Sequence, residues 1–268
     1  MSDRVWALIL GVSSGFGAAA ARAFAQEGYD IFGVHLDRRA AADRIAALVS
    51  DLRSSAPDRR VYFFNENAAN DASRAKMIGQ FKEILAQTGG HIRVLLHSLA
   101  FGTLRPYIYP PDDDRHDRPA SRKQIEMTVD VMANSLVYWS QDLVEAALLK
   151  QSRIFAMTSA GSQRAWHNYG PVSAAKAALE AHVRQLCLEL APHGHTVNAI
   201  MAGVTDTPAL QKIPNSEALM GAAIQRNPHR RLTRPDDVAA CLIELARPGT
   251  YWMTGNVICV DGGEDACA

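Results

Sequence analysis

Residues 5–28 read VWALILGVSSGFGAAAARAFAQEG, and this stretch decides the fold. Its first six residues are apolar, as expected of a short buried strand. Glycines follow at positions 11, 15 and 17, and an alanine-rich run then predicts a helix. A strand, a glycine turn and a helix in this order bind the pyrophosphate of a dinucleotide, because glycines admit the phosphates close to the backbone and the helix N-terminus favours their charge. The spacing G-x3-G-x-G is a variant of the common G-x-G-x2-G pattern.

The rest of the chain continues the alternation of strands and helices. We expect further strands at 30–36, 61–64, 92–97, 154–158, 196–200 and 257–260, and helices at 39–53, 72–87, 124–150 and 173–190. This order predicts an α/β fold with a Rossmann-type, doubly wound parallel sheet of about seven strands, as one domain over residues 1–268. Residues 105–123 are polar and proline-containing and predict an extended loop. Residues 206–232 contain three prolines and no strand pattern, so we expect a mobile lid over the substrate site.

Composition limits the functions that the chain can have. It has 268 residues, of which 48% are hydrophobic and 21% charged, with a formal net charge of zero. This balance argues against nucleic acid or an anionic membrane as a partner. The four cysteines are scattered without a C-x-x-C pair, which favours reduced thiols in a cytoplasmic protein over a disulfide or metal-binding framework. The apolar run at 5–10 is too short to cross a membrane.

The best candidate for acid chemistry is the stretch MTSAGSQRAWHNYGPVSAAKAALE at 157–180. Tyr169 lies ten residues after Ser159 and seven before Lys176, and Pro171 suits the first turn of a helix that begins next to the tyrosine. A phenol can donate a proton to a substrate oxygen, and a nearby ammonium would lower the pKa of that phenol. The alternative is an ordinary tyrosine and lysine on an amphipathic helix. A spacing of Y-x6-K does not decide between the two by itself.

The end of the second strand bears on the choice of cofactor. An acid there would bind a ribose 2′-hydroxyl, whereas an arginine suits a 2′-phosphate. The strand is followed by Asp37, Arg38 and Arg39. We favour NADPH, with Arg38 as the phosphate partner. In the alternative reading the arginines only begin a solvated helix, and NADH remains possible.

Several ordered motifs resemble the short-chain dehydrogenase/reductase superfamily over essentially the whole chain. They are the glycine turn at 11–17, the segment 97–102, Ser159, Tyr169, Lys176, the V-N-A triplet at 197–199, Thr207, and T-G-N-V-I-C-V-D-G-G at 254–263.

Within the superfamily the chain is most similar to the bacterial enoyl-acyl-carrier-protein reductases. These share the Y-x6-K spacing, whereas ketoreductase-type members have Y-x3-K. The fourth strand ends in H-S-L-A-F in place of N-N-A-G, and Met132 occupies the position that we align with a catalytic asparagine. N-Y-G-P-V-S-A-A-K-A-A-L-E and the lid stretch P-A-L-Q-K-I-P-N complete the resemblance.

The chain also departs from the family pattern. Ala202 and Gly203 stand where many members have Pro-Gly, and the loop at 105–123 is longer than usual, which leaves the substrate open. Ser14 is uncharged where several NADPH-using members carry a basic residue, which weakens the preference for NADPH.

The resemblance implies a role for each site residue. Tyr169 would donate a hydrogen bond to the substrate oxygen, Ser159 would assist it, and Lys176 would bind the nicotinamide ribose. The remaining implied cofactor contacts are Gly11, Ser13, Ser14, Phe16 and Gly17 at the pyrophosphate, Asn67 and Ala68 at the adenine, Ser98, Leu99 and Ala100 at the ribose, and Val204, Thr205 and Thr207 at the carboxamide.

The implied reaction is the NAD(P)H-dependent reduction of a trans-2-enoyl thioester, carried on acyl carrier protein, by a homotetramer assembled through helices 124–150 and 173–190. One alternative is a ketoreductase that acts on a 3-oxoacyl thioester or another ketone. A second is a regulatory protein that binds NAD(P) without catalysis. Phe101, Tyr107 and Trp166 are candidates for the substrate pocket. We interpret His97 as a structural residue and not as a base.

Overall fold

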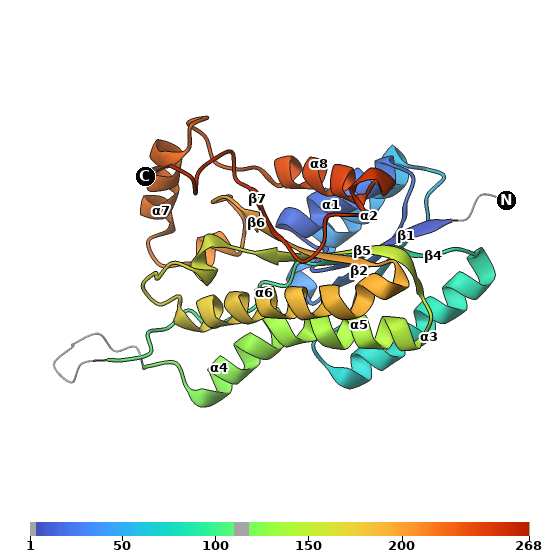
Figure 1. The fold of residues 1–268 in the computed structure, drawn as a ribbon, viewed down its shortest axis with the longest axis horizontal. Coiled ribbons are helices and arrows are strands. Elements are labelled where there is room, and N and C mark those ends of the chain that lie inside the picture. The colour runs from blue at the N-terminus through green and yellow to red at the C-terminus, as the bar shows by residue number, and fades with distance from the viewer. Residues whose placement is uncertain (1–3, 110–117, 268) are drawn as a thin grey trace.

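The computed structural model describes residues 4–109 and 118–267. Its centre is one parallel sheet of seven strands in the order β3-β2-β1-β4-β5-β6-β7 (Figure 1). The chain reverses direction along the sheet between β1 and β4, which is where ligands bind in doubly wound folds. The strands are β1 Val5–Leu10, β2 Asp30–His35, β3 Val61–Asn65, β4 His91–His97, β5 Leu149–Thr158, β6 Thr196–Ala202 and β7 Val257–Val260. The predicted α/β fold class is confirmed.

Helices cover both faces of the sheet (Figure 1). One buried apolar cluster joins the sheet to α1 Gly15–Gln26, α2 Ala42–Ser55 and α8 Pro235–Ala246. A second cluster joins the other face to α3 Asp71–Thr88, α5 Ser135–Glu145 and α6 Gly170–Leu190. Every residue of β2 is buried, as expected of a central strand with helices on both sides. Because helices cover both faces of the sheet, the ends of the strands are the place left for a ligand site.

The glycine turn between β1 and α1 is set by close backbone approach. A Cβ on Gly17 would lie 2.1 Å from the Gly11 carbonyl oxygen, so no side chain fits there. Gly11 has φ +90° and its Cβ would lie 2.3 Å from the Ser98 carbonyl oxygen. Both glycines are therefore required for α1 to begin directly above the ends of β1 and β4.

The prediction of one long helix over 124–150 is wrong at both ends and in the middle. The structure instead has α4 Arg122–Val129, a π-helical turn at Asp130–Asn134, and α5, which ends at Glu145. Ala147 adopts φ +55°, which stops the helix without a glycine, and β5 already begins at residue 149. Several of the first residues of β5 are polar because they lie at the solvent-exposed amino-terminal end of the strand. Their polarity kept the sequence analysis from recognising this part of the strand.

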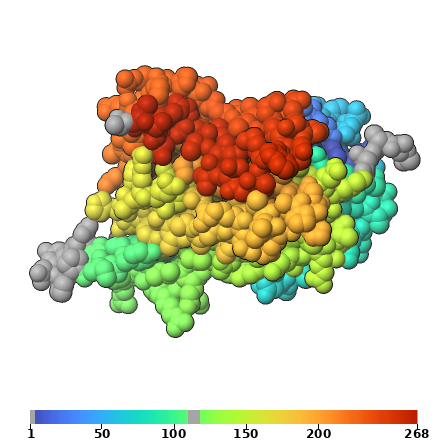
Figure 2. Space-filling view, viewed as in Figure 1, coloured from blue at the N-terminus to red at the C-terminus, as the bar shows by residue number. Residues whose placement is uncertain are grey.

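The expected loop is only partly described, whereas the segment expected to be a lid is described in full. Of the loop at 105–123, residues 110–117 lie outside the described part, and α4 begins at Arg122 with Ser121 as its capping residue. Residues 206–232 contain no strand, as expected, but they do contain a short 3-10 turn at Leu210–Lys212 and the helix α7 Ser216–Arg226. Figure 2 shows the C-terminal residues packed between this orange segment and the yellow segment that follows β5. None of the helices in the described ranges has the length and apolarity to cross a membrane.

Candidate active site

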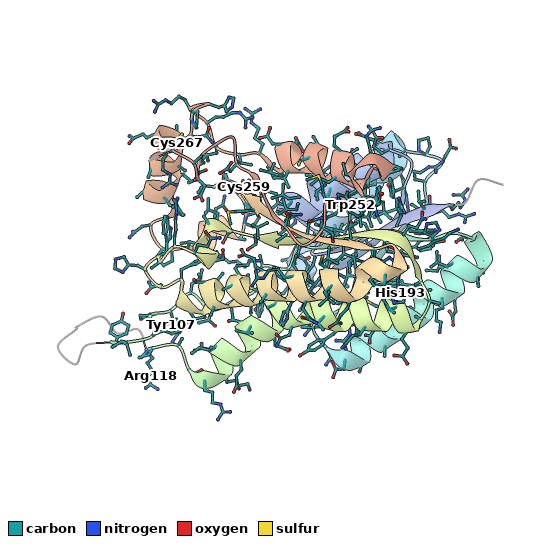
Figure 3. The ribbon with its side chains drawn as sticks, viewed as in Figure 1. Tyr107, Arg118, His193, Trp252, Cys259 and Cys267 are labelled. Atoms are coloured by element: carbon teal, nitrogen blue, oxygen red, sulfur yellow. The ribbon has the colours of Figure 1, made fainter. Side chains whose placement is uncertain are left out.

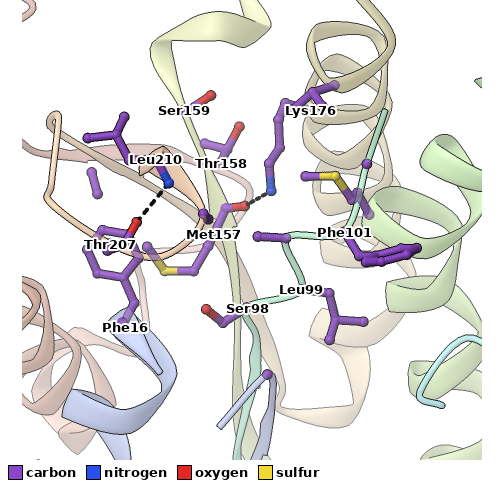
Figure 4. Close-up of a pocket in the computed structure, with 18 of the residues that line it drawn as sticks. Phe16, Ser98, Leu99, Phe101, Met157, Thr158, Ser159, Lys176, Thr207 and Leu210 are labelled. Atoms are coloured by element: carbon purple, nitrogen blue, oxygen red, sulfur yellow. Dashed lines mark hydrogen bonds between the residues drawn. The ribbon is translucent and has the colours of Figure 1, made fainter. Parts of the chain in front are cut away.

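A cavity of about 570 Å³ opens at the carboxyl ends of the strands. The expected catalytic residues Ser159, Tyr169 and Lys176 all line it, and Figure 4 shows Ser159 and Lys176 on neighbouring segments of its wall. Most of the expected cofactor residues line the same cavity: Gly11, Ser13, Ser14, Phe16, Asn67, Ala68, Ser98, Leu99, Ala100, Val204, Thr205 and Thr207. Segments that are distant in the sequence thus meet in one site.

Tyr169 lies at the start of α6, and Ser159 lies directly after β5. Their hydroxyl oxygens are 3.3 Å apart, so either can donate to the other. Gly161 makes this approach possible, since a Cβ there would lie 2.4 Å from the tyrosine ring. Burial raises the pKa of Tyr169, and the Ser159 hydroxyl offsets part of that rise. Tyr169 is therefore protonated at neutral pH and available as a donor.

Lys176 is buried, with 6% of its surface exposed. Its Nζ donates a 2.6 Å hydrogen bond to the Met157 carbonyl, as Figure 4 shows. Burial lowers the pKa of Lys176 to about 8, and the carboxylate of Glu180 acts in the opposite direction. The expectation that the ammonium lowers the pKa of Tyr169 is not met in this structure, because burial dominates and Ser159 is the group that lowers it.

Glu180 is a site residue that the sequence analysis missed. It lies one helical turn after Lys176, is 7% exposed, and accepts a 2.6 Å hydrogen bond from the Thr158 hydroxyl. A buried carboxylate at this place favours the charged form of the lysine. The i, i+4 spacing of Lys176 and Glu180 on an expected helix was the available signal.

The turn at the start of α1 suits a dinucleotide. The cavity reaches Ser13, Ser14 and Gly15 at the N-terminus of α1, and the first turn of this helix contains no acidic residue. Its positive end and backbone N–H groups therefore face the cavity without a competing carboxylate. Gly17 does not line the cavity, but it permits the close turn described above. These residues fit the pyrophosphate of a nicotinamide cofactor.

The end of β2 differs from the expectation for Arg38. Arg38 is exposed and is not among the residues that line the cavity, whereas His35 and Leu36 are. Asp37 accepts hydrogen bonds from Arg44 at 2.9 Å and pairs with His35 at 3.1 Å. The assignment of Arg38 as the phosphate partner is therefore not supported by its position. Arg44 lies outside the strand-end pattern and gave no signal in the sequence.

His97 is structural, as expected. It is fully buried, and its Nε2 lies 2.8 Å from the Ser135 hydroxyl. That hydroxyl donates to the Val131 carbonyl, so it accepts from the histidine. Burial and Lys176 lower the pKa of His97 to about 3. A histidine that stays neutral and does not line the cavity has no part in proton transfer.

Many of the residues that line the cavity are apolar. Phe101 and Trp166 line it, as expected, whereas Tyr107 does not. The Tyr107 ring instead packs on Gly170, where a Cβ would lie 2.5 Å from it. Met132 also lines the cavity, so a thioether occupies the position that we align with the asparagine of ketoreductases. Further apolar lining residues include Leu104, Met127, Val131, Val172, Leu210, Ile213 and Leu219.

The segment expected to be a lid is joined to the C-terminal segment by polar contacts. Arg226 at the end of α7 forms a 2.8 Å ion pair with Glu264, which also accepts from the Val204 N–H at 3.0 Å. Asn227 donates to the Asp261 carbonyl at 2.8 Å. Arg164, which also lines the cavity, pairs with Asp265 at 2.9 Å. The sequence analysis noted the segment 261–263 only as a motif and missed this role.

The fold and the site together define an NAD(P)H-dependent oxidoreductase of the short-chain dehydrogenase/reductase superfamily. A family model described as enoyl-(acyl carrier protein) reductase matches residues 11–264, and the chain belongs to this family.

Two relatives that align with most of the chain have low sequence identity to it. The chain is 28% identical over 193 residues to the NADH-dependent enoyl-acyl-carrier-protein reductase FabI of Aquifex aeolicus, which covers 72% of this chain and 69% of the relative. It is 27% identical to an uncharacterised oxidoreductase of Mycobacterium tuberculosis, over 98% of this chain and 92% of the relative. The crystal structure of the Aquifex aeolicus reductase aligns with a TM-score of 0.79 at 24% identity, over 98% and 96% of the two chains, which shows a shared fold.

Proposed function

We propose that this protein reduces the carbon–carbon double bond of a trans-2-enoyl thioester, with NADPH as the reductant. The observation that carries the proposal is the place of Tyr169 at the start of α6, two helical turns from Lys176, above an apolar cavity. In ketone reduction the carbon that accepts the hydride bears the oxygen that is protonated. In an enoyl thioester that oxygen lies two atoms further away, which suits a donor held outside the helix.

Tyr169 is the group that meets the substrate oxygen. As negative charge develops on the thioester oxygen, a hydrogen bond from the phenol stabilises that charge. Because the phenol is already oriented, little free energy is spent on reorienting it during the reaction. Ser159 holds the phenol hydroxyl at 3.3 Å and so sets its direction. The apolar wall around Phe101 and Trp166 would enclose the acyl chain and exclude water.

The residues of the glycine turn, with Lys176, would hold the cofactor, which supplies the hydride when bound. We keep NADPH as the proposed form because Arg38 and Arg39 follow the end of β2 in the chain and Arg44 contacts Asp37, so three arginines stand against one carboxylate in this segment. This excess of positive charge favours a 2′-phosphate. A higher kcat/KM with NADH than with NADPH would contradict it.

We also propose that the acyl group is carried on acyl carrier protein and that the enzyme is a homotetramer assembled through α5 and α6. Val144 on α5 and Leu188 on α6 are exposed apolar side chains, which supports an interface there. Equal turnover of coenzyme A and carrier-protein thioesters would contradict the first part, and a monomer mass in sedimentation velocity the second.

The central test measures oxidation of NADPH and of NADH with a trans-2-enoyl thioester and with a 3-oxoacyl thioester. We expect turnover of the enoyl substrate, and we expect Tyr169→Phe to lower its kcat by about 10²-fold or more, as for loss of an oriented donor. Tyr138→Phe is the matched control, because Tyr138 bonds to Asp130 at 3.1 Å and does not line the cavity. Faster turnover of the ketone would favour the ketoreductase alternative, and unchanged enoyl turnover in Tyr169→Phe would refute the role of the phenol.

A further inference from the structure

Two arginines meet at the amino-terminal edge of the sheet, at the opposite end from the cavity. Arg93 comes from β4 and Arg153 from β5. Both guanidinium groups donate through Nη1 to the same acceptor, the Gln151 carbonyl, the contact from Arg153 being 3.3 Å. Two positive charges thus converge on a single neutral oxygen.

Neither charge is neutralised. Across residues 4–109 and 118–267, no carboxylate lies within ion-pair distance of Arg93 or Arg153. Arg153 is 3% exposed, and its Nε is buried without a hydrogen-bond partner. The other buried arginine, Arg74, pairs with both Asp71 and Asp142. Buried charges are normally paired, so Arg153 has the properties of a binding group rather than of a structural one.

The groups around the arginines are suited to an anion. Burial and the neighbouring Arg93 lower the pKa of Arg153, and both arginines lie within electrostatic reach of Tyr29 and His195. The buried His195 accepts from the Ser152 N–H at Nδ1 at 2.9 Å, so its Nε2 carries the proton as a donor. The acid near Tyr29 is Glu27, which is exposed and has no ion pair in the described ranges.

The backbone at this place is also unusual. Gln151 adopts φ +47°, a left-handed conformation that is strained for a residue with a side chain. It does so at the start of β5, where its carbonyl receives both guanidinium groups. Strain of this kind persists where the surrounding structure holds it, and it is frequent at ligand sites.

We propose that Arg93 and Arg153 form a second binding site, for a phosphate dianion, at the amino-terminal edge of the sheet. A phosphate group matches two guanidinium charges and offers oxygens to both at once, whereas a carboxylate matches one. The site is separate from the cavity. Arg153 and Ser159 are six residues apart on a strand path, which corresponds to about 20 Å. Figure 3 shows His193, near this edge, at the opposite end of the molecule from Tyr107.

The probes are inorganic phosphate and, as a phosphate monoester, glycerol phosphate. The thermal midpoint of the full-length protein is followed in each, against sodium chloride and sodium acetate at equal ionic strength, and the dissociation constant is measured by calorimetry. We expect phosphate to raise the midpoint and acetate to raise it much less. Phosphate can also bind at the glycine turn before α1. The arginine variants described next therefore decide which binding event belongs to the second site.

Arg93→Gln and Arg153→Gln should each weaken the second phosphate-binding event by about tenfold or more, the loss expected for a charge-assisted contact. In phosphate-free buffer each should leave the midpoint unchanged or raise it, because an unpaired charge has been removed. Arg247→Gln is the matched control, since this arginine is at the same end of the molecule but is paired with Glu244 at 2.8 Å. It should bind phosphate as the wild type does.

Three results would overturn the proposal. They are phosphate binding that is identical in Arg93→Gln and the wild type, equal stabilisation by acetate and phosphate, and a lower midpoint of the folded Arg93→Gln variant in phosphate-free buffer. Because Arg93 is only half-buried, this variant tests the site even if Arg153→Gln does not fold. Response to inorganic phosphate but not to the monoester would identify the free ion as the ligand, and the reverse would identify a phosphorylated metabolite.

Discussion

At the scale of single residues, the proposed chemistry uses a lysine whose pKa is lowered by burial. Lys176 has a pKa of about 8, and the carboxylate of Glu180 keeps that value from falling further. We expect Glu180→Gln to lower the pKa of Lys176, so that the positive charge is lost at a lower pH. The alkaline limb of the kcat/KM profile should then move to lower pH, and each unit of movement corresponds to about 1.4 kcal/mol.

The matched control for this experiment is Glu189→Gln. Glu189 lies on the same helix, is exposed, and interacts with Gln185. Its removal should leave the pH profile in place. An alkaline limb that does not move in Glu180→Gln would show that the carboxylate does not act through the lysine.

At the scale of secondary-structure elements, the turn from β1 to α1 has no room for a side chain. Gly17→Ala places a methyl group 2.1 Å from the Gly11 carbonyl oxygen, which forces the helix away from the strand. We expect a loss of about 1–3 kcal/mol in the free energy of unfolding, as for overpacking of a well-packed core, together with weaker binding of the cofactor.

Gly79 in α3 gives the opposite expectation. A Cβ there meets nothing within 4 Å, and the residue is exposed. Gly79→Ala should stabilise the protein by about 0.5–1 kcal/mol, because alanine has the higher helix propensity. Urea unfolding of both variants provides the measurement, and equal stability of Gly17→Ala and the wild type would contradict the account of the turn.

The surroundings of each secondary-structure element decide whether it could be predicted from the sequence. The strands β1 and β7 and the fold class were predicted because apolar runs between glycines have few other readings. The helix at 124–150 was wrong because Ala147 ends α5 with a left-handed backbone that no glycine announces. The segment that follows it, including Lys150 and Arg153, is polar, so the start of β5 resembles a helix in sequence.

The site was predicted less completely than the fold. Tyr169, Ser159 and Lys176 could be found from their spacing together with the resemblance to the short-chain dehydrogenase/reductase superfamily, and the structure brings them to one cavity. The contacts of Glu180 with Thr158 and of Arg44 with Asp37 were missed because they join different elements, whose separation the sequence does not state, although the i, i+4 spacing of Glu180 from Lys176 was available. Arg38 was assigned by its place after the strand, yet its side chain is exposed and does not line the cavity.

At the scale of the whole molecule, the buried charge of Lys176 is a cost to stability. The pKa of Lys176 is about 8 in the folded protein and near 10.5 in the unfolded chain. Between these values the unfolded chain binds more protons, so the free energy of unfolding should rise with pH in that window. The difference between the two pKa values corresponds to about 3 kcal/mol.

The substitution Lys176→Met removes the contribution of Lys176 to the pH dependence of the free energy of unfolding. The gain in stability of the variant over the wild type should therefore be largest below pH 8 and shrink by up to about 3 kcal/mol towards pH 10.5. Unfolding by urea at pH 7, 8.5 and 10 measures it. If the free energies of unfolding of the two proteins changed with pH in parallel, the pKa of Lys176 would not be lowered in the folded protein.

The ion pairs of Glu264 and Asp265 have a consequence for directed evolution of this enzyme. They tie Arg226 of α7 and Arg164 after β5 to one short tail, and all four side chains line the cavity. Substitutions in that tail would change how these two segments are held without altering the apolar residues of the lining. A selection for new substrates should therefore return changes at these two carboxylates, alongside changes in the apolar wall itself.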